Sequence, residues 1–179
     1  MWNTGHELYR STPETFPVPF VQGDILDSAY LAPAPILPTS STPPPNPLPI
    51  LSEVKTLNEL HGTISAMFAS AFFHLFEFDN QEQVARKLAG LLSPLPGSII
   101  FGSHTTTGVK ERLELGETRS DCHSQESWKE LWEGIFGEAG VKVEVKTRLR
   151  KHLGGRTLFG TYPEGAKERF YLDWSITRV

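Results

Sequence analysis

Two histidines stand directly after apolar stretches in the middle of the sequence. His74 follows the run at residues 63–70, and His104 follows the run at 98–102. An imidazole at the end of a strand can act as a base toward a hydroxyl group, and α/β proteins bind ligands at the carboxyl ends of parallel strands. A lone histidine at such a place is more often structural. We therefore keep His74 as a candidate catalytic base and His104 as a candidate for the rim of a substrate site.

Cys122 and His123 form the other cluster of chemically active side chains. No second ligand pair lies at a spacing that zinc requires, so we expect no metal site. Nothing in the sequence around Cys122 supports a role as a nucleophile. A single cysteine also excludes an intrachain disulfide framework and fits a reducing compartment, which favours the cytoplasm.

Length and composition set the class of protein. A chain of 179 residues is enough for one domain, and we expect residues 1–179 to form it. The net charge of −4 gives no reason to expect nucleic acid or an anionic membrane as a partner. No stretch reaches the ~20 apolar residues of a membrane span, and residues 1–7 lack the form of a signal peptide.

The sequence predicts a central strand–helix–strand unit. The apolar runs at 63–70 and 98–102 are the strands, residues 79–92 have helical spacing, and 93–97 form a Pro–Gly turn. A run that is apolar on both faces suits a parallel strand with helices on either side, and a crossover helix of this length fits between two such strands.

A second helix and two alternating strands follow this unit. Ser124 caps the helix, whose stripe of large apolar side chains indicates core packing and needs no ligand. The stripe consists of Trp128, Leu131, Trp132, Ile135 and Phe136. Residues 141–149 and 170–176 alternate between apolar and polar side chains, which predicts a closing pair of antiparallel strands after a loop at 154–165.

Residues 32–49 contain eight prolines in eighteen positions. Such a segment offers no regular ladder of donors, and we expect an exposed, polyproline-like insert with no apolar face to bury. A ligand for a proline-recognising module is the functional alternative. On composition alone, deletion of residues 33–47 should be nearly neutral for stability.

The central unit resembles part of a known family. Ala69-Ser70-Ala71-Phe72-Phe73-His74-Leu75-Phe76, followed by a helix and by Leu91-Leu92-Ser93-Pro94-Leu95-Pro96-Gly97-Ser98-Ile99-Ile100, is similar to the centre of class I S-adenosylmethionine-dependent methyltransferases. Gly102-Ser103-His104 and the tail 170–179 most resemble fungal methyltransferases of secondary metabolism, such as those of meroterpenoid clusters. The order and spacing of these motifs are more specific than any one of them.

This resemblance implies a cofactor and a site. Asp24, with Ile25 beside it, falls where the family's third strand ends in a carboxylate that accepts from the adenine amino group. The alternative is an ordinary turn or cap aspartate. Ala69 and Ser70 fall where the backbone lies along the methionine part of S-adenosylmethionine, and His74 falls near the mouth of the cofactor and substrate site. The implied substrate is a small molecule, methylated at oxygen.

The sequence departs from the family in one respect. No glycine-rich loop follows a strand, and the family's first and second strands have no counterpart, so the chain is expected to begin one strand too late. The predicted fold is therefore an incomplete Rossmann-like, three-layer αβα arrangement that keeps the family's third, fourth, fifth, seventh and sixth strands. Residues 19–26 would then dock beside 63–70, or a second copy would pair there edge to edge to form a homodimer.

Two functions remain open at this point. One is S-adenosylmethionine-dependent methylation of a small-molecule acceptor, in which the protein mainly aligns the reacting groups. The other is a catalytically inactive, truncated methyltransferase-like fragment with a binding role.

Overall fold

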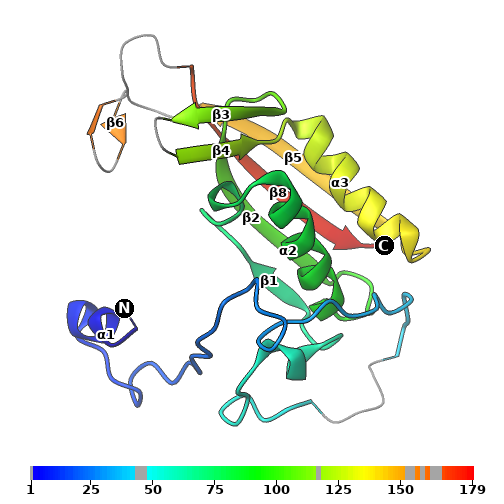
Figure 1. Cartoon of the computed structure of the whole chain (residues 1–179). Coiled ribbons are helices and arrows are strands. Elements are labelled where there is room, and N and C mark those ends of the chain that lie inside the picture. The colour runs from blue at the N-terminus through cyan, green and yellow to red at the C-terminus, as the bar shows by residue number, and fades with distance from the viewer. Residues whose placement is uncertain (1, 43–47, 116–117, 152–155, 158–159, 162–166) are drawn as a thin grey trace.

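The computed structural model describes residues 2–42, 48–115, 118–151, 156–157, 160–161 and 167–179 (Figure 1). Its helices and short helical turns are α1 (Trp2–Tyr9), η1 (Leu57–Leu60), η2 (Phe73–Leu75), α2 (Phe78–Leu91) and α3 (Gln125–Glu138). Its strands are β1 (Ala66–Phe68), β2 (Ile99–Thr106), β3 (Glu111–Leu115), β4 (Thr118–Cys122), β5 (Val143–Lys151), β6 (Arg156–Thr157), β7 (Gly160–Thr161) and β8 (Phe170–Arg178). Most of the predicted loop at 154–165 lies outside the described residues.

The main sheet has four strands in the order β1-β2-β8-β5. β1 pairs with β2 in parallel, with Met67 opposite Ile100. β8 runs antiparallel between β2 and β5, with Ile176 opposite Ile100 on one side and Val145 on the other. The predicted order of these four strands and their antiparallel finish are confirmed.

Both long helices, α2 and α3, lie on the same face of this sheet (Figure 1). α2 connects β1 to β2, and α3 lies on the path from β2 to β5, so both crossovers step in the same direction across the sheet. Right-handed crossovers that step the same way must place their helices on one face. The predicted three-layer arrangement is therefore wrong for the described part of the chain, which has two layers.

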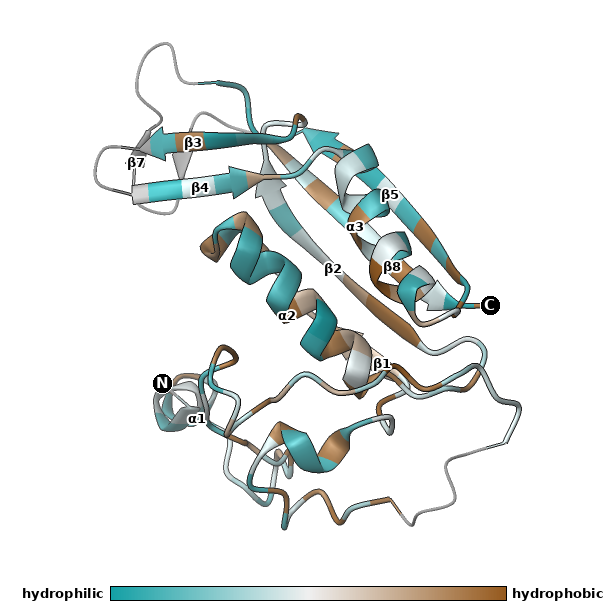
Figure 2. Cartoon of the chain, turned by 45° about the vertical axis from the view of Figure 1, so that its right-hand side comes forward, coloured by the Kyte–Doolittle hydropathy of each residue, from teal (hydrophilic) through white to brown (hydrophobic). Residues whose placement is uncertain are grey.

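Among the described residues, Figure 2 again shows both long helices on one side of the sheet, and the character of the opposite face changes from β1 to β5. On β1 and β2 this face is apolar: Phe68 is 70% exposed, Phe101 is 38% exposed, and their ring centroids are 5.2 Å apart. On β5 the same face is charged, because Arg148 and Arg150 both pair with Asp173 of β8. The β5 side is suited to water, and the β1 side is not.

An aromatic cluster fills the space between α3 and the sheet. Its rings come from η2, β2, α3 and β8: Phe73, His104, Trp128, Trp132, Phe136 and Trp174. Phe73 contacts Trp128 and Trp174 edge to face, at centroid distances of 4.9 and 5.7 Å. Such pairs add to the burial of apolar area. The predicted α3 stripe is confirmed as core, with Leu131 partly buried at its margin.

The predicted strand at residues 19–26 is wrong. The segment has no strand structure, and the sheet has four strands with β1 at its edge. Pro17 and Pro19 cannot donate to a ladder. Side chains hold the segment instead. Tyr30 Oη donates to the Val21 carbonyl at 2.8 Å, and Lys87 Nζ donates to the Ile25 carbonyl at 3.0 Å.

The first part of the proline-rich segment, around residues 36–40, contacts the core and the end of the sheet, although its composition predicted an exposed loop. The side chain of Ile36 lies against the core, and Arg178 donates to the carbonyl of Leu37 at 2.9 Å. The backbone of Ser40 donates to the Pro94 carbonyl at 3.0 Å. The expectation that this segment has no apolar face to bury is thus wrong for Ile36, while residues 43–47 lie outside the described residues. The structure gives no reason to expect its deletion to be neutral.

The polar stretch between β2 and α3 forms a hairpin, β3–β4, which the sequence did not indicate. Asp121 of β4 joins this hairpin to α2, and its side chain is fully buried. The carboxylate accepts two hydrogen bonds from Arg112 at 2.7 Å and one from the Phe78 N–H at the start of α2, also at 2.7 Å. It therefore satisfies an otherwise unpaired donor of the helix terminus.

No helix in the described ranges is both long enough and apolar enough to cross a membrane.

Substitution of this buried carboxylate should destabilise the fold in a pH-dependent way. Asp121→Asn should lower the free energy of unfolding at pH 7 by about 2 kcal/mol, because the amide cannot replace the charged hydrogen bonds. The bonds from Arg112, then that from Phe78, hold the pKa of Asp121 below its ordinary value. The stabilisation is thus present above the ordinary pKa of ~3.9 and is lost as pH falls through the lower folded-state value.

Denaturant unfolding at several pH values measures this effect. The difference between the wild type and Asp121→Asn should narrow as pH falls below about 4. Asp173→Asn is the matched control, with a smaller loss, because Arg148 and Arg150 are 74% and 51% exposed. Equal losses for the two variants would show that Asp121 does not join the hairpin to α2.

Candidate functional site

The carboxyl end of β1 meets the middle of β2 at Gly102. The Ala69 N–H donates to the Phe101 carbonyl at 2.9 Å, and the Ala71 N–H donates to the Ser103 carbonyl at 2.7 Å. A Cβ atom on Gly102 would lie 1.9 Å from the Ala69 carbonyl oxygen, so only glycine permits this approach. The backbone of Ala69 is thereby fixed against β2.

The chain turns sharply after Ser70. Ala71 has φ of +51°, a left-handed conformation that alanine rarely adopts. Strained backbone of this kind persists only where the surroundings impose it. The turn sends Phe73 into the aromatic cluster and places His74 beside it on η2.

His74 is a partly buried imidazole on η2. Burial, and then the positive charge of Arg169, lower its pKa below the ordinary value, so the ring is neutral at pH 7. Its Nδ1 atom is buried and has no hydrogen-bond partner among the described residues. The Nε2 atom is therefore the nitrogen available to a molecule at the surface.

His104 lies inside the protein. Its ring is only 3% exposed, and Nδ1 accepts a hydrogen bond from Trp174 Nε1 at 3.0 Å. Burial, followed by the nearby His123 and His74, lowers its pKa to about 3. The expectation that His104 borders a substrate site is wrong, because its side chain points to the helix-covered face of β2.

Cys122 and His123 also have structural roles. His123 Nδ1 shares a hydrogen bond with Ser127 Oγ at 2.9 Å, and burial lowers the pKa of the ring to about 4. Cys122 is a buried free thiol. The described residues contain no cluster of histidine, cysteine and carboxylate side chains that could hold a metal ion.

Asp24 and Ile25 form a turn that is bound to α2. Asp24 Oδ1 accepts from the Leu26 N–H at 2.9 Å, and its carbonyl accepts from the Asp27 N–H at 3.1 Å. Lys87 Nζ donates to the carbonyls of Ile25 and Leu26, both at 3.0 Å. Asp24 itself is exposed, and Oδ1 is the carboxylate oxygen that the turn uses.

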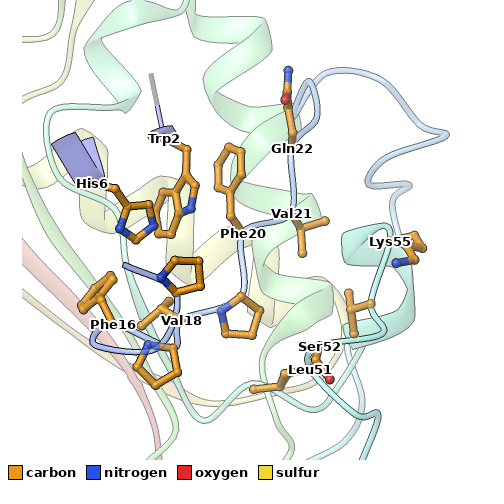
Figure 3. A pocket seen from close by; sticks show the side chains of 14 residues that line it. Trp2, His6, Phe16, Val18, Phe20, Val21, Gln22, Leu51, Ser52 and Lys55 are labelled. Atoms are coloured by element: carbon orange, nitrogen blue, oxygen red, sulfur yellow. The ribbon is translucent and has the colours of Figure 1, made fainter. Parts of the chain in front are cut away.

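Residues that directly precede this turn help to line a pocket with aromatic walls (Figure 3). Trp2 and Phe20 stack face to face with ring centroids 4.7 Å apart. His6 contacts the edge of Trp2 at 5.3 Å. The pocket has a volume of about 460 Å³, and Lys55 contributes a positive charge to its far wall.

The predicted site residues thus lie in two places. Ala69, Ser70 and His74 lie together at the end of β1, whereas Asp24 and Ile25 lie against the second half of α2. None of the hydrogen bonds described above joins these two places. Sequence analysis missed Lys87 and the pocket around Trp2. Lys87 had a signal, since it shares the apolar helix stripe with Val84 and Leu91.

Comparison with known proteins identifies a class. No family profile matches the chain. O-methyltransferase phiE of Fungal sp. (strain ATCC 74256) is 35% identical over 132 residues, which are 68% of this chain and 41% of that protein. Methyltransferase ausD of Penicillium brasilianum is 33% identical over 90 residues, 49% of this chain and 32% of that protein. O-methyltransferase atr3 of Stereocaulon alpinum is 27% identical over 112 residues, 60% and 32% respectively.

These relatives confirm the resemblance seen in the sequence: the chain is similar to fungal methyltransferases over part of their length. The chain spans less than half the length of each of the three relatives. A solved S-adenosylmethionine dependent methyltransferase from Mesorhizobium loti aligns with 66% of the chain and 63% of its own, with a TM-score of 0.38 and 12% identity. That likeness is too weak to support an inference.

Addition of a single methyl group at Gly102 tests the close approach of the β1 and β2 backbones. Gly102→Ala should lower the free energy of unfolding by about 2 kcal/mol, because the new Cβ overlaps the Ala69 carbonyl and forces β1 away from β2. Backbone amide signals of Ser70 and Ala71 should shift in NMR spectra.

Gly134→Ala is the matched control. Gly134 is an exposed residue within α3 with no atom close to an added Cβ. Alanine there should stabilise the helix by up to ~1 kcal/mol. A neutral Gly102→Ala variant with unshifted signals would contradict the described pairing of β1 and β2.

Proposed function

We propose that this chain takes part in S-adenosylmethionine-dependent methyl transfer to an oxygen of a small molecule. The supporting observation is the 35% identity to O-methyltransferase phiE over 132 residues. A second relative, from Aspergillus novofumigatus, is named asnovolin E/chermesin D methyltransferase and is 31% identical over 94 residues. A substrate of that kind, a fungal secondary metabolite, is the acceptor class that we propose here.

Four residues would hold the cofactor: Asp24, Ile25, Ala69 and Ser70. The remaining carboxylate oxygen of Asp24 suits an exocyclic amine of adenine, and the small side chains of Ala69 and Ser70 leave room along the backbone for the methionine part. The pocket around Trp2 and Phe20 directly precedes Asp24, and aromatic faces stack well on a base. We place the adenine there.

When bound, S-adenosylmethionine supplies the methyl group and its sulfonium leaving group. The chain's own contribution is to orient the acceptor and remove its proton, and we assign the latter step to His74. The neutral ring would accept the hydroxyl proton at Nε2, because Nδ1 is buried. An NMR titration midpoint of His74 above its ordinary pKa of ~6.5 would show that burial does not hold the ring neutral.

The free edge of β1 provides a surface on which a second copy could pair. In a parallel strand, the backbone N–H and C=O groups of successive residues point to opposite neighbouring strands. The Ala69 N–H donates to β2, so the backbone groups of Phe68 point to the free edge. This edge carries no charge and no proline to prevent association. We propose a homodimer through this edge, in the cytoplasm, where Cys122 would stay reduced. Sedimentation that shows only monomer at every concentration would reject the pairing.

Titration with S-adenosylmethionine tests the proposed cofactor site. Trp2 is the one partly exposed tryptophan, while Trp128, Trp132 and Trp174 are buried. Binding should therefore quench the fluorescence of Trp2. Asp24→Ala should weaken binding by about 1.5–3 kcal/mol, through loss of a hydrogen bond to a charged group.

Trp2→Phe is the control for the fluorescence signal. It should abolish the quenching and leave binding measurable by calorimetry, since phenylalanine can still stack on the base. Quenching that survives in Trp2→Phe would place the adenine elsewhere. Absence of binding in the wild-type chain would support the alternative function, a non-catalytic fragment with a binding role.

A further inference from the structure

Lys87 is a fully buried cation on the apolar face of α2. It shares that face with Val84, Leu88 and Leu91, and the exposed fraction of its side chain is 0%. Burial of an ammonium group is costly unless hydrogen bonds compensate for the lost water. A lysine at this position therefore needs an explanation beyond packing.

Both hydrogen bonds described for this ammonium go to backbone carbonyls, those of Ile25 and Leu26. The same turn fixes Asp24, because Asp24 Oδ1 accepts from the Leu26 N–H and the Asp24 carbonyl accepts from the Asp27 N–H. A continuous chain of hydrogen bonds thus leads from Lys87 through Leu26 to the carboxylate of Asp24.

Asn58 of η1 donates to the carbonyls of Ser28 and Ala29, just after the turn. Among the described hydrogen bonds, those that reach the turn itself from a regular element come from Lys87 of α2. Residues 17–31 contain neither helix nor strand, and the turn is not part of the sheet. The side chains of Ile25 and Leu26 pack against the core, but apolar contacts alone do not fix the direction of a backbone. The two bonds from Lys87 supply that direction.

We infer that Lys87 is a positioning residue for cofactor binding, which holds the Asp24–Ile25 turn on α2 so that the Asp24 carboxylate presents a free oxygen to an adenine amino group. This inference rests on the proposed function. Lys87 does not touch the cofactor in this account, and it acts only through the turn. An error of about 1 Å in the place of a binding group is enough to reduce its contribution severely.

Arg178 offers a matched control on the same stretch of chain. It is also a buried cation, 1% exposed, and it donates to a backbone carbonyl, that of Leu37, further along the irregular segment. Its guanidinium also lies over the ring of Phe136 at 5.5 Å. A general loosening of the segment should follow from loss of either cation, whereas misplacement of Asp24 should follow only from loss of Lys87.

The test compares Lys87→Met and Arg178→Met with the wild type. Methionine keeps an apolar stem and removes the charge, and such replacements of buried ions need not destabilise a protein. Calorimetric titration with S-adenosylmethionine should show affinity weakened about tenfold or more in Lys87→Met, from the lost hydrogen bonds to a charged group. Arg178→Met should stay within about twofold of the wild type, because its site is separate.

Amide hydrogen exchange gives a second readout that does not depend on the cofactor. The amides of Leu26 and Asp27 should exchange faster in Lys87→Met and at the wild-type rate in Arg178→Met. Unchanged affinity in Lys87→Met, or equal losses in both variants, would overturn the inference while the proposed function stands. If the wild-type chain fails to bind S-adenosylmethionine, both the proposed function and the inference are wrong. Faster exchange of the Leu26 amide in Lys87→Met would then show only that Lys87 holds the turn, without a role in cofactor binding.

Discussion

The parallel pairing of β1 with β2 is the constraint on which the rest of the structure depends. It is short, and at Gly102 the two backbones approach so closely that a side chain is excluded. This pairing fixes the ends of α2, because the helix must return from one strand to the next. It also sets the turn at Ala71, through which Phe73 enters the aromatic core and His74 reaches the surface.

A one-sided sheet follows from that arrangement. Because both crossovers step in one direction, the helices cover one face and leave Phe68 and Phe101 on the other. The residues before β1 do not extend the sheet. They are held instead by side-chain donors, notably Lys87 and Arg178, that bind carbonyls which a neighbouring strand would otherwise pair. Of these two cations, Lys87 is the one that binds the turn carrying Asp24, the candidate cofactor residue.

Periodicity predicted the features that local patterns determine. The α3 stripe from Trp128 to Phe136 and the alternation of β5 and β8 followed from periodicity, whereas the order of the four strands came from the family resemblance. The strand at 19–26 was predicted wrongly because an apolar segment forms a strand only if a partner offers a ladder, and that is a long-range property. The buried state of His104 depends likewise on Trp174, far away in the sequence. The site residues Asp24, Ile25, Ala69, Ser70 and His74 came from family resemblance and remain predictions of function.

Residue-resolved amide hydrogen exchange on the dilute, monomeric chain tests the central pairing most directly. If β1 bonds to β2 alone, the Ala69 amide should exchange slowly, because it donates to the Phe101 carbonyl. The Phe68 amide, which faces the free edge, should exchange quickly. Rapid exchange at Ala69 would mean that the parallel pair does not form, and protection of Phe68 in the monomer would mean that β1 is not the edge of the sheet.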